Sequence, residues 1–128
     1  MFKKNDSPQQ STISSFNVLV PDKLLSKMMG TPEWAFYERI FLRINEDVFK
    51  VLYSDKLSRP NVPVNLLAAS LILKELKRWT FAELFNHINF DLLARAALGL
   101  HDLNVTPYAE STLFLFQKKL SEFYAKED

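Results

Sequence analysis

Residues 64–89 read VNLLAASLILKELKRWTFAELFNHIN, and they carry the strongest helical pattern in the sequence. From Val64 to Trp79 apolar residues cover nearly the whole circumference of a helix, which is typical of a central, buried helix. Thr80 and Glu83 then form a capping-box pattern, which marks the start of a second helix. That second helix has one apolar stripe, consisting of Phe81, Leu84, Phe85 and Ile88. The stretch predicts two helices joined by a short turn.

The residues before this stretch begin with a polar segment. Residues 1–15 have only Phe2 and Ile13 to bury, and they predict a flexible tail. Residues 16–20 predict a short extended apolar segment that Pro21 ends. Residues 22–29 predict a helix, which Asp22 caps and Gly30 stops.

Two further helices are expected before the central one. Thr31 at the N-cap and Pro32 at the first helical position start a helix with one buried stripe. That stripe consists of Tyr37, Ile40, Phe41 and Ile44. Asn45 then caps a short helix, whose inward-facing residues are Val48, Phe49 and Leu52. Residues 53–63 contain Pro60, Pro63 and several turn formers, and they predict a loop.

The chain continues in helices after residue 90. Residues 91–98 predict a helix with a stripe of Leu92, Leu93, Ala96 and Ala97, which Gly99 ends. Residues 100–110 predict an irregular connection, and residues 111–124 a last helix with a stripe of Leu113, Phe116, Leu120 and Phe123. We therefore expect an all-α fold. It is a compact bundle of six or seven helices, formed by residues 16–128 as one domain.

Composition excludes several classes of protein. The 128 residues are 48% hydrophobic and 24% charged, which is typical of a folded globular domain and excludes a disordered chain. The absence of cysteine excludes disulfides, thiolate zinc sites and cysteine nucleophiles. A formal charge of +1 means that any nucleic-acid surface must come from local arrangement. No secretory signal and no apolar run long enough to cross a bilayer is present, so we expect a cytoplasmic protein.

The tight turn at residues 77–79 makes the two helices of the opening stretch a helix-turn-helix candidate. The second helix would present Asn86, His87 and Asn89 outward, and asparagine can read the edge of an adenine. The cations nearest to these residues are Lys74, Lys77 and Arg78, which could hold phosphates. The alternative is an ordinary pair of packed helices, which most all-α domains contain.

Other charged and apolar residues allow two interpretations each. Arg59 either reaches phosphate or contacts a carboxylate or helix end, and Lys118 and Lys119 either bind phosphate or form a solvated face. Phe114 and Leu115 make the last helix apolar on more than one side, which indicates either deep burial or packing on another domain. Together with Tyr124 they are the candidate protein-interaction residues.

Metal binding and catalysis find little support. His87 and His101 are the only histidines, and their spacing matches no pair of ligands on one helix. The sequence has no glycine-rich phosphate loop and no nucleophile elbow. We therefore assign no metal site, no cofactor and no catalytic residue.

An ordered series of short motifs resembles the N-terminal domain of bacterial insertion-sequence transposases of the DDE class. The motifs are residues 53–56 (YSDK), 59–63 (RPNVP), 71–76 (LILKEL), 90–92 (FDL), 97–100 (ALGL), Pro107, 111–113 (STL) and 116–120 (FQKKL). The resemblance extends from about Val18 to Leu120, and it is densest from Tyr53 onward.

This resemblance implies a helical domain that helps to bind the terminal inverted repeats of a mobile element. In that family an RNase-H-like catalytic domain with a metal-binding acidic triad follows. The 128 residues leave no room for it, so we expect a fragment that is not an enzyme by itself. Its expected partner is double-stranded DNA. The alternative is an interaction module that packs on the catalytic domain or on a second copy, because residues 114–117 (FLFQ) replace charge that the family commonly carries.

Overall fold

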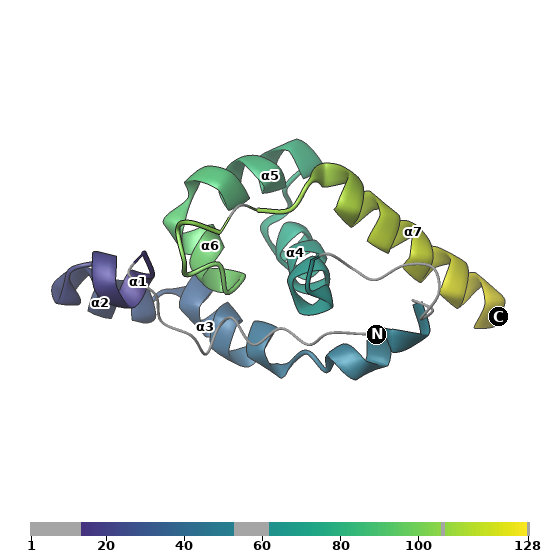
Figure 1. The fold of residues 1–128 in the computed structure, drawn as a ribbon, viewed down its shortest axis with the longest axis horizontal. Helices are drawn as coiled ribbons and strands as arrows, with labels where there is room; N and C mark the ends of the chain where they lie inside the picture. Colours follow the sequence, from purple (N-terminus) through teal and green to yellow (C-terminus); the bar gives the residue numbers. More distant parts are fainter. Residues whose placement is uncertain (1–13, 53–61, 106, 128) are drawn as a thin grey trace.

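The computed structural model describes residues 14–52, 62–105 and 107–127, and every regular element in these ranges is helical (Figure 1). The prediction of an all-α fold is confirmed. An isolated bridge between Ser15 and Asp102 is the one β-type pairing in the described ranges. The α-helices are α1 (Phe16–Leu19), α2 (Asp22–Met29), α3 (Pro32–Arg39), α4 (Val64–Lys77), α5 (Phe81–Phe90), α6 (Leu92–Ala97) and α7 (Glu110–Glu127). Two 3₁₀ helices, η2 (Phe41–Arg43) and η3 (Glu46–Leu52), follow α3.

α4 is the central helix, as its apolar circumference predicts. It lies between α3 with the two 3₁₀ helices on one side and α5, α6 and α7 on the other (Figure 1). Every residue from Val64 to Ser70 is buried, because neighbours surround its first turns. In its second half only Leu73 is buried, whereas Ile72 and Leu76 are exposed. α4 is therefore buried on all sides only over its first two turns, although apolar residues surround the helix for longer.

The N-terminal segment is helical, so the prediction of an extended segment over residues 16–20 is wrong. Phe16 is the reason, because its ring is 1% exposed and its backbone N–H donates to the carbonyl of His101 at 2.9 Å. Val18 and Leu19 remain exposed, so one buried anchor holds the whole turn. Residues 1–13 of the predicted tail lie outside the described residues. Within the described range, contacts with the rest of the domain already begin at Ser14, whose carbonyl accepts from the N–H of Leu103 at 3.0 Å.

The helix over residues 22–29 is confirmed, but its ends differ from the prediction. Asp22 is the first helical residue, and Pro21 holds the N-cap position without a side-chain hydrogen bond. Gly30 ends the helix with φ of −91°, which any residue can adopt. Thr31 caps α3 as predicted, because its Oγ1 accepts from the backbone N–H of Trp34 at 3.3 Å.

The chain tightens into 3₁₀ geometry after Arg39, where an α-helix up to Ile44 was expected. The Oδ1 atom of Asn45 accepts from the N–H of Asp47 at 3.0 Å and starts η3. Three residues per turn rotate the side chains away from the α-helical stripe. For this reason Val48 is 61% exposed, and its predicted inward orientation is wrong. The side chain of Leu52 and the loop predicted over residues 53–61 lie outside the described residues.

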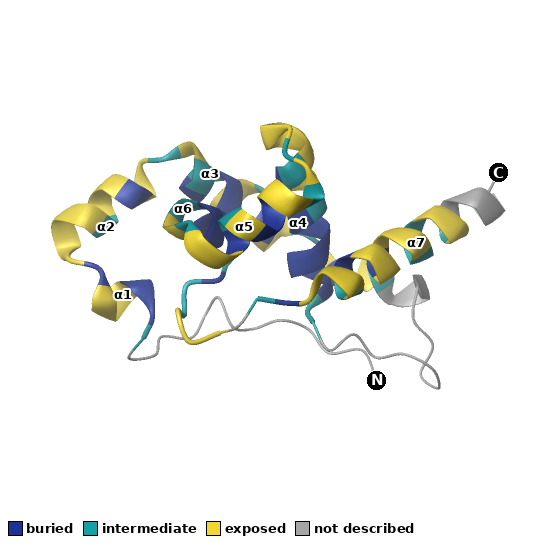
Figure 2. Cartoon of the chain, turned by 90° about the horizontal axis from the view of Figure 1, so that it is seen from above, coloured by how far each residue is buried: buried dark blue, intermediate teal, exposed yellow. Residues whose placement is uncertain are grey.

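α5, α6 and α7 complete the bundle close to the predicted boundaries. Asp91 caps α6, because its Oδ1 accepts from the N–H of Leu93 at 2.9 Å. Leu92 was expected in the buried stripe of α6, but its side chain is 42% exposed. Gly99 ends the segment in the left-handed region with φ of 71°. Burial is concentrated where α3, α4, α5 and α6 meet, whereas α2 and the outer face of α7 are exposed (Figure 2).

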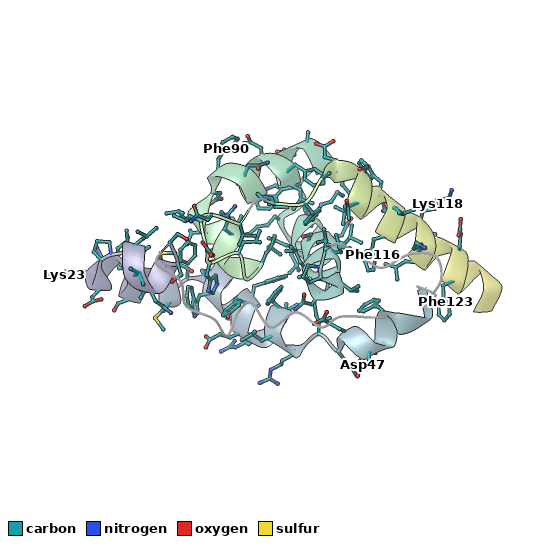
Figure 3. All side chains as sticks on the ribbon, viewed as in Figure 1. Lys23, Asp47, Phe90, Phe116, Lys118 and Phe123 are labelled. Carbon is teal, nitrogen blue, oxygen red and sulfur yellow. The ribbon has the colours of Figure 1, made fainter. Side chains whose placement is uncertain are left out.

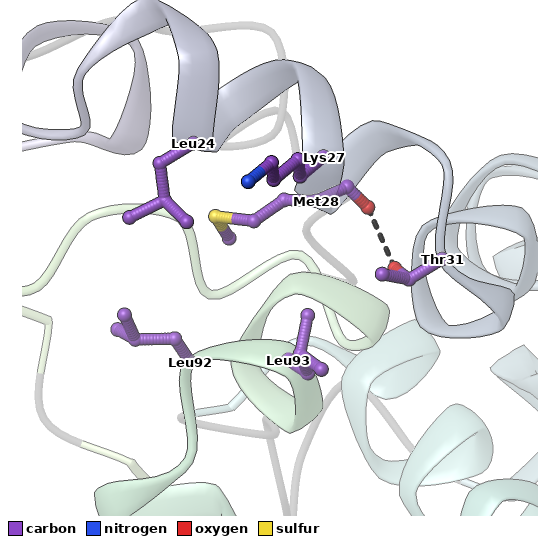
Figure 4. Close-up of a pocket in the computed structure, with 6 residues that line it drawn as sticks. All are labelled: Leu24, Lys27, Met28, Thr31, Leu92 and Leu93. Carbon is purple, nitrogen blue, oxygen red and sulfur yellow. Dashed lines mark hydrogen bonds between the residues drawn. The ribbon is translucent and has the colours of Figure 1, made fainter.

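An apolar cleft separates α2 from α6 (Figure 4). Its volume is about 260 Å³. Leu24 and Met28 line it from α2, and Leu92 and Leu93 from α6, with Lys27 and Thr31 completing the wall. The hydroxyl of Thr31 is already engaged, because it donates to the carbonyl of Met28 at 2.6 Å. The cleft thus explains the partial exposure of Leu92 and Leu24.

Candidate nucleic-acid interface

The turn between α4 and α5 is set by backbone hydrogen bonds around Arg78. Arg78 adopts the left-handed conformation with φ of 57° and ψ of 39°. Its N–H donates to the carbonyl of Glu75 at 3.2 Å, and the N–H of Trp79 donates to the carbonyl of Lys74 at 3.0 Å. These two bonds satisfy carbonyls that the helix end would otherwise leave unpaired. The helix therefore stops within one residue, and α5 starts at once.

The start of α5 is the capping box that the sequence predicts. Thr80 Oγ1 accepts from the N–H of Glu83 at 3.1 Å, and Glu83 Oε1 accepts from the N–H of Thr80 at 2.9 Å. The hydrogen bond from the Thr80 backbone, followed by the bond with its side chain, lowers the pKa of Glu83. Glu83 consequently carries a full negative charge at neutral pH.

α5 crosses α4 instead of lying alongside it (Figure 1 and Figure 2). Its buried side consists of Leu84, Phe85 and Ile88. Its exposed side consists of Ala82, Glu83, Asn86, Asn89 and Phe90, which we call the α5 face. The crossing leaves this face open to solvent, as a recognition helix requires.

His87 does not point freely toward a ligand. Its ring stacks on Trp79 with centroids 4.1 Å apart and planes 8° apart, and its Nδ1 lies 2.8 Å from Asp91 Oδ2. Asp91 also caps α6, so this group joins the turn, α5 and α6. His87 therefore helps to orient α5 and is not presented outward as predicted.

The two asparagines on the α5 face differ in how they are held. Asn89 Nδ2 donates to the carbonyl of Phe85 at 2.8 Å, which ties the amide back onto its own helix. Asn86 is exposed, and its side-chain amide makes no hydrogen bond to the described residues. Asn86 therefore offers both its donor and its acceptor to a ligand.

The three cations around the turn are also held differently. Lys74 lies 3.3 Å from Glu75 Oε1, and its Nζ is 4.5 Å above the ring of Phe81. Lys77 Nζ lies 2.6 Å from Glu33 Oε2. Arg78 is exposed and forms no ion pair within the described residues. Arg78 is thus the cation of this group that is available to a phosphate.

The other predicted phosphate-binding residues lie away from this turn. α7 begins beside the start of α5 and runs away from it, and Lys118 points outward from its middle (Figure 3). Lys118 is exposed, whereas Lys119 is half-buried. Arg59 lies outside the described residues. The structure does not bring Lys118 and Lys119 together with the α5 face.

The predicted interaction residues of α7 are exposed where the structure describes them. Phe114 is 42% and Leu115 53% exposed, while Leu113 and Phe116 on the opposite side are buried. The ring of Phe114 contacts Phe81 edge-on, with centroids 4.8 Å apart. The side chain of Tyr124 lies outside the described residues.

The two histidines lie in separate surroundings. His101 is packed among the rings of Phe16, Trp34 and Tyr37, at centroid distances of 5.0, 5.1 and 4.4 Å. Burial lowers the pKa of His101, against the opposing effect of its hydrogen bond with the Ala96 carbonyl. Among the described residues, no three His, Asp or Glu side chains group closely enough to hold a metal ion. In those ranges no helix combines the length and apolarity that crossing a membrane requires.

Two structural features were missed at the level of sequence. Arg95 is buried within α6, where the pattern LLARAA indicated only an apolar stripe. The sequence places Trp79 in the turn without a role, and no local pattern indicates that its ring stacks on His87. Both features hold α5 and α6 in place.

Comparison with known protein families gives a match over most of the chain. The family model described as "Transposase domain (DUF772)" matches residues 14–119, which is most of the chain. No curated protein and no solved structure matches the sequence.

Proposed function

This chain belongs to the DUF772 transposase-domain family, and from that premise we propose that it binds the terminal inverted repeats of a mobile element. Membership of the family indicates a role in transposition. Within the family we place the chain with bacterial insertion-sequence transposases of the DDE class, on the order of its motifs from residue 53 onward. The proposed contact surface is the α5 face together with Arg78. We assign DNA binding, and not catalysis, to the described residues.

The observation that carries this proposal is the conformation of Arg78. A left-handed backbone costs an L-residue roughly 1–2 kcal/mol, and glycine would hold the same turn with less strain. Arg78 nevertheless occupies this position, exposed and without an ion pair among the described residues. Strain of this kind is found where function requires a particular side chain. A guanidinium beside the start of a recognition helix is well placed to hold a phosphate.

Replacing Arg78 with glycine tests this assignment, because stability and affinity should change in opposite directions. We expect Arg78→Gly to raise the free energy of unfolding by about 0.5–1 kcal/mol, since the left-handed strain is removed. We expect its affinity for duplex DNA to fall roughly fivefold on every sequence, with a salt slope smaller by about 1. Chemical denaturation and fluorescence anisotropy at several salt concentrations measure the two effects.

Lys77→Ala is the matched control for this variant. Lys77 is the neighbouring cation, but its Nζ is engaged by Glu33 at 2.6 Å. We expect its salt slope to stay close to that of the wild type. If Arg78→Gly binds DNA as tightly as the wild type, Arg78 does not contact phosphate.

Glu83 places a negative charge on the proposed DNA-binding face, and its removal should strengthen binding. Glutamine also fits the third position of a capping box, so Glu83→Gln keeps the helix start and removes only the charge. We expect affinity for duplex DNA to rise roughly threefold at low salt and the gain to shrink as salt is added. Glu122→Gln, on exposed α7, is the control and should leave affinity unchanged. If both substitutions change the DNA affinity equally, the DNA does not bind at the α5 face.

A second candidate function is docking on a catalytic domain or on a second copy of the chain. The exposed pair Phe114 and Leu115 favours it, because the opposite side of α7 already supplies the contacts to the core. Sedimentation at increasing concentration separates the dimer form of this function from DNA binding by a monomer. A monomer at all concentrations that still binds DNA excludes the dimer.

A further inference from the structure

Phe90 is the most exposed large apolar residue in the described part of the chain. Its side chain is 83% exposed, and it projects from the end of α5 away from the rest of the domain (Figure 3). Among the described residues, Phe90 is not part of the hydrophobic core, and its ring contacts no other aromatic ring. Single exposed apolar side chains are common on protein surfaces, so the neighbours of Phe90 on α5 must show what it contacts.

The position of Phe90 on its helix points to the partner. Phe90 follows Asn86 by four residues, so the two side chains lie on the same side of α5, one turn apart. Other polar side chains of α5 are already engaged, because Glu83 caps the helix, His87 stacks on Trp79 and Asn89 bonds to Phe85. On the α5 face, the amide of Asn86 and the ring of Phe90 therefore remain free to contact a partner.

The amide of Asn86 suits the edge of an adenine in the major groove, and the ring of Phe90 suits the methyl group of a thymine. A side-chain amide can pair with N6 and N7 of adenine, and an apolar side chain can contact the C5-methyl group of thymine. Four residues of α-helix rise about 6 Å, which is close to the length of two base steps at about 3.4 Å each. Asn86 and Phe90 can thus reach bases that are one or two positions apart.

We propose that Phe90 is a specificity-determining residue that contacts the methyl group of a thymine within two base pairs of an adenine bound by Asn86. This inference rests on the proposed DNA-binding function and names the bases that the α5 face reads. The terminal repeat is expected to contain an adenine and a thymine at this spacing, and their exchange for G·C pairs is expected to abolish preferential binding.

Replacing thymine with deoxyuridine tests the contact, because it deletes only the methyl group. The probe is the terminal repeat of the element that encodes this chain, with each thymine replaced in turn. We expect one replacement to weaken wild-type binding about fourfold, which corresponds to losing one buried methyl-sized group. Phe90→Ala should bind the unmodified repeat about as weakly, and the same replacement should then have no further effect. Asn86→Ala is the control, since it should lose affinity and keep its sensitivity to the replacement.

The outcomes separate this inference from the function on which it rests. A wild-type protein that prefers the repeat but is insensitive to every thymine replacement overturns the role of Phe90 and leaves DNA binding intact. A wild-type protein that does not distinguish the repeat from a shuffled duplex overturns the proposed function itself. If Phe90→Ala instead changes the sedimentation of the free protein and not its DNA affinity, Phe90 contacts protein and the inference is wrong. Thermal unfolding should show Phe90→Ala to be as stable as the wild type, because the side chain is exposed.

Discussion

Gly99→Ala is expected to destabilise the domain by about 3 kcal/mol or more. Gly99 has φ of 71°, a conformation that costs an L-residue roughly 1–2 kcal/mol. A Cβ atom added there would lie 2.5 Å from Cε1 and 2.6 Å from Cζ of Phe41. The Phe41 ring is 1% exposed and cannot move aside without disturbing the core, and overpacking of this kind costs typically 1–3 kcal/mol. Urea denaturation followed by circular dichroism measures the loss.

Gly30→Ala is the control for this prediction, because the chain contains only two glycines. Gly30 has φ of −91°, and the nearest atom to an added Cβ is the carbonyl oxygen of Lys27 at 3.6 Å. We expect a stability change between zero and a gain of about 1 kcal/mol, since alanine restricts the unfolded chain. Similar losses in both variants would contradict the close approach of Gly99 to Phe41.

Arg95→Met should also cost about 3 kcal/mol, because Arg95 holds the connection after α6 against the helices. The side chain is 5% exposed and donates to three carbonyls, those of Ile88 at 3.3 Å and of Asp102 and Val105 at 3.0 Å. Burial lowers the pKa of its guanidinium, with an opposing effect from Asp102, and the group stays charged at neutral pH. Methionine keeps a long side chain but leaves the three carbonyls without their donor.

Arg43→Met is the matched control, since Arg43 is exposed on η2. Its expected change in stability is within about 0.5 kcal/mol. Hydrogen exchange adds a local measurement, because the backbone N–H of Val105 donates to the carbonyl of Asp102 at 3.1 Å. We expect Arg95→Met to raise the exchange rate of this amide before the global transition. An unchanged rate would show that Arg95 does not hold the connection.

Sequence patterns within single helices predicted most of the fold, because helix starts and apolar stripes depend on interactions between residues close in sequence. The capping box at Thr80 and Glu83 and the Thr31–Pro32 start depend on hydrogen bonds between residues three positions apart, and both are present as expected. The burial of Phe16 depends instead on His101, which is distant in the sequence and whose ring also stacks on Trp34. An apolar run of four residues does not reveal such partners, which explains the wrong extended assignment.

The candidate site could be predicted only as a set of residue types. Helix periodicity predicts Asn86, His87 and Asn89 on the polar side of α5. Asn86 and Asn89 lie on its exposed face, whereas His87 is half-buried against Trp79. The contacts of these side chains could not be predicted. The stacking of His87 on Trp79 and the hydrogen bond from Asn89 to the Phe85 carbonyl both depend on the three-dimensional geometry. In the same way, the pairing of Lys77 with Glu33 joins residues 44 positions apart.

Recognition of the terminal repeat by α5 and the turn at Arg78 underlies the whole proposed function. Fluorescence anisotropy of the wild-type domain with that repeat and with a shuffled duplex, each at several salt concentrations, tests it most directly. We predict tighter binding to the repeat at every salt concentration, with log affinity falling by about 0.9 per phosphate contact for each unit of log salt. Equal affinity for the two duplexes would contradict recognition by α5 and would favour docking through Phe114 and Leu115.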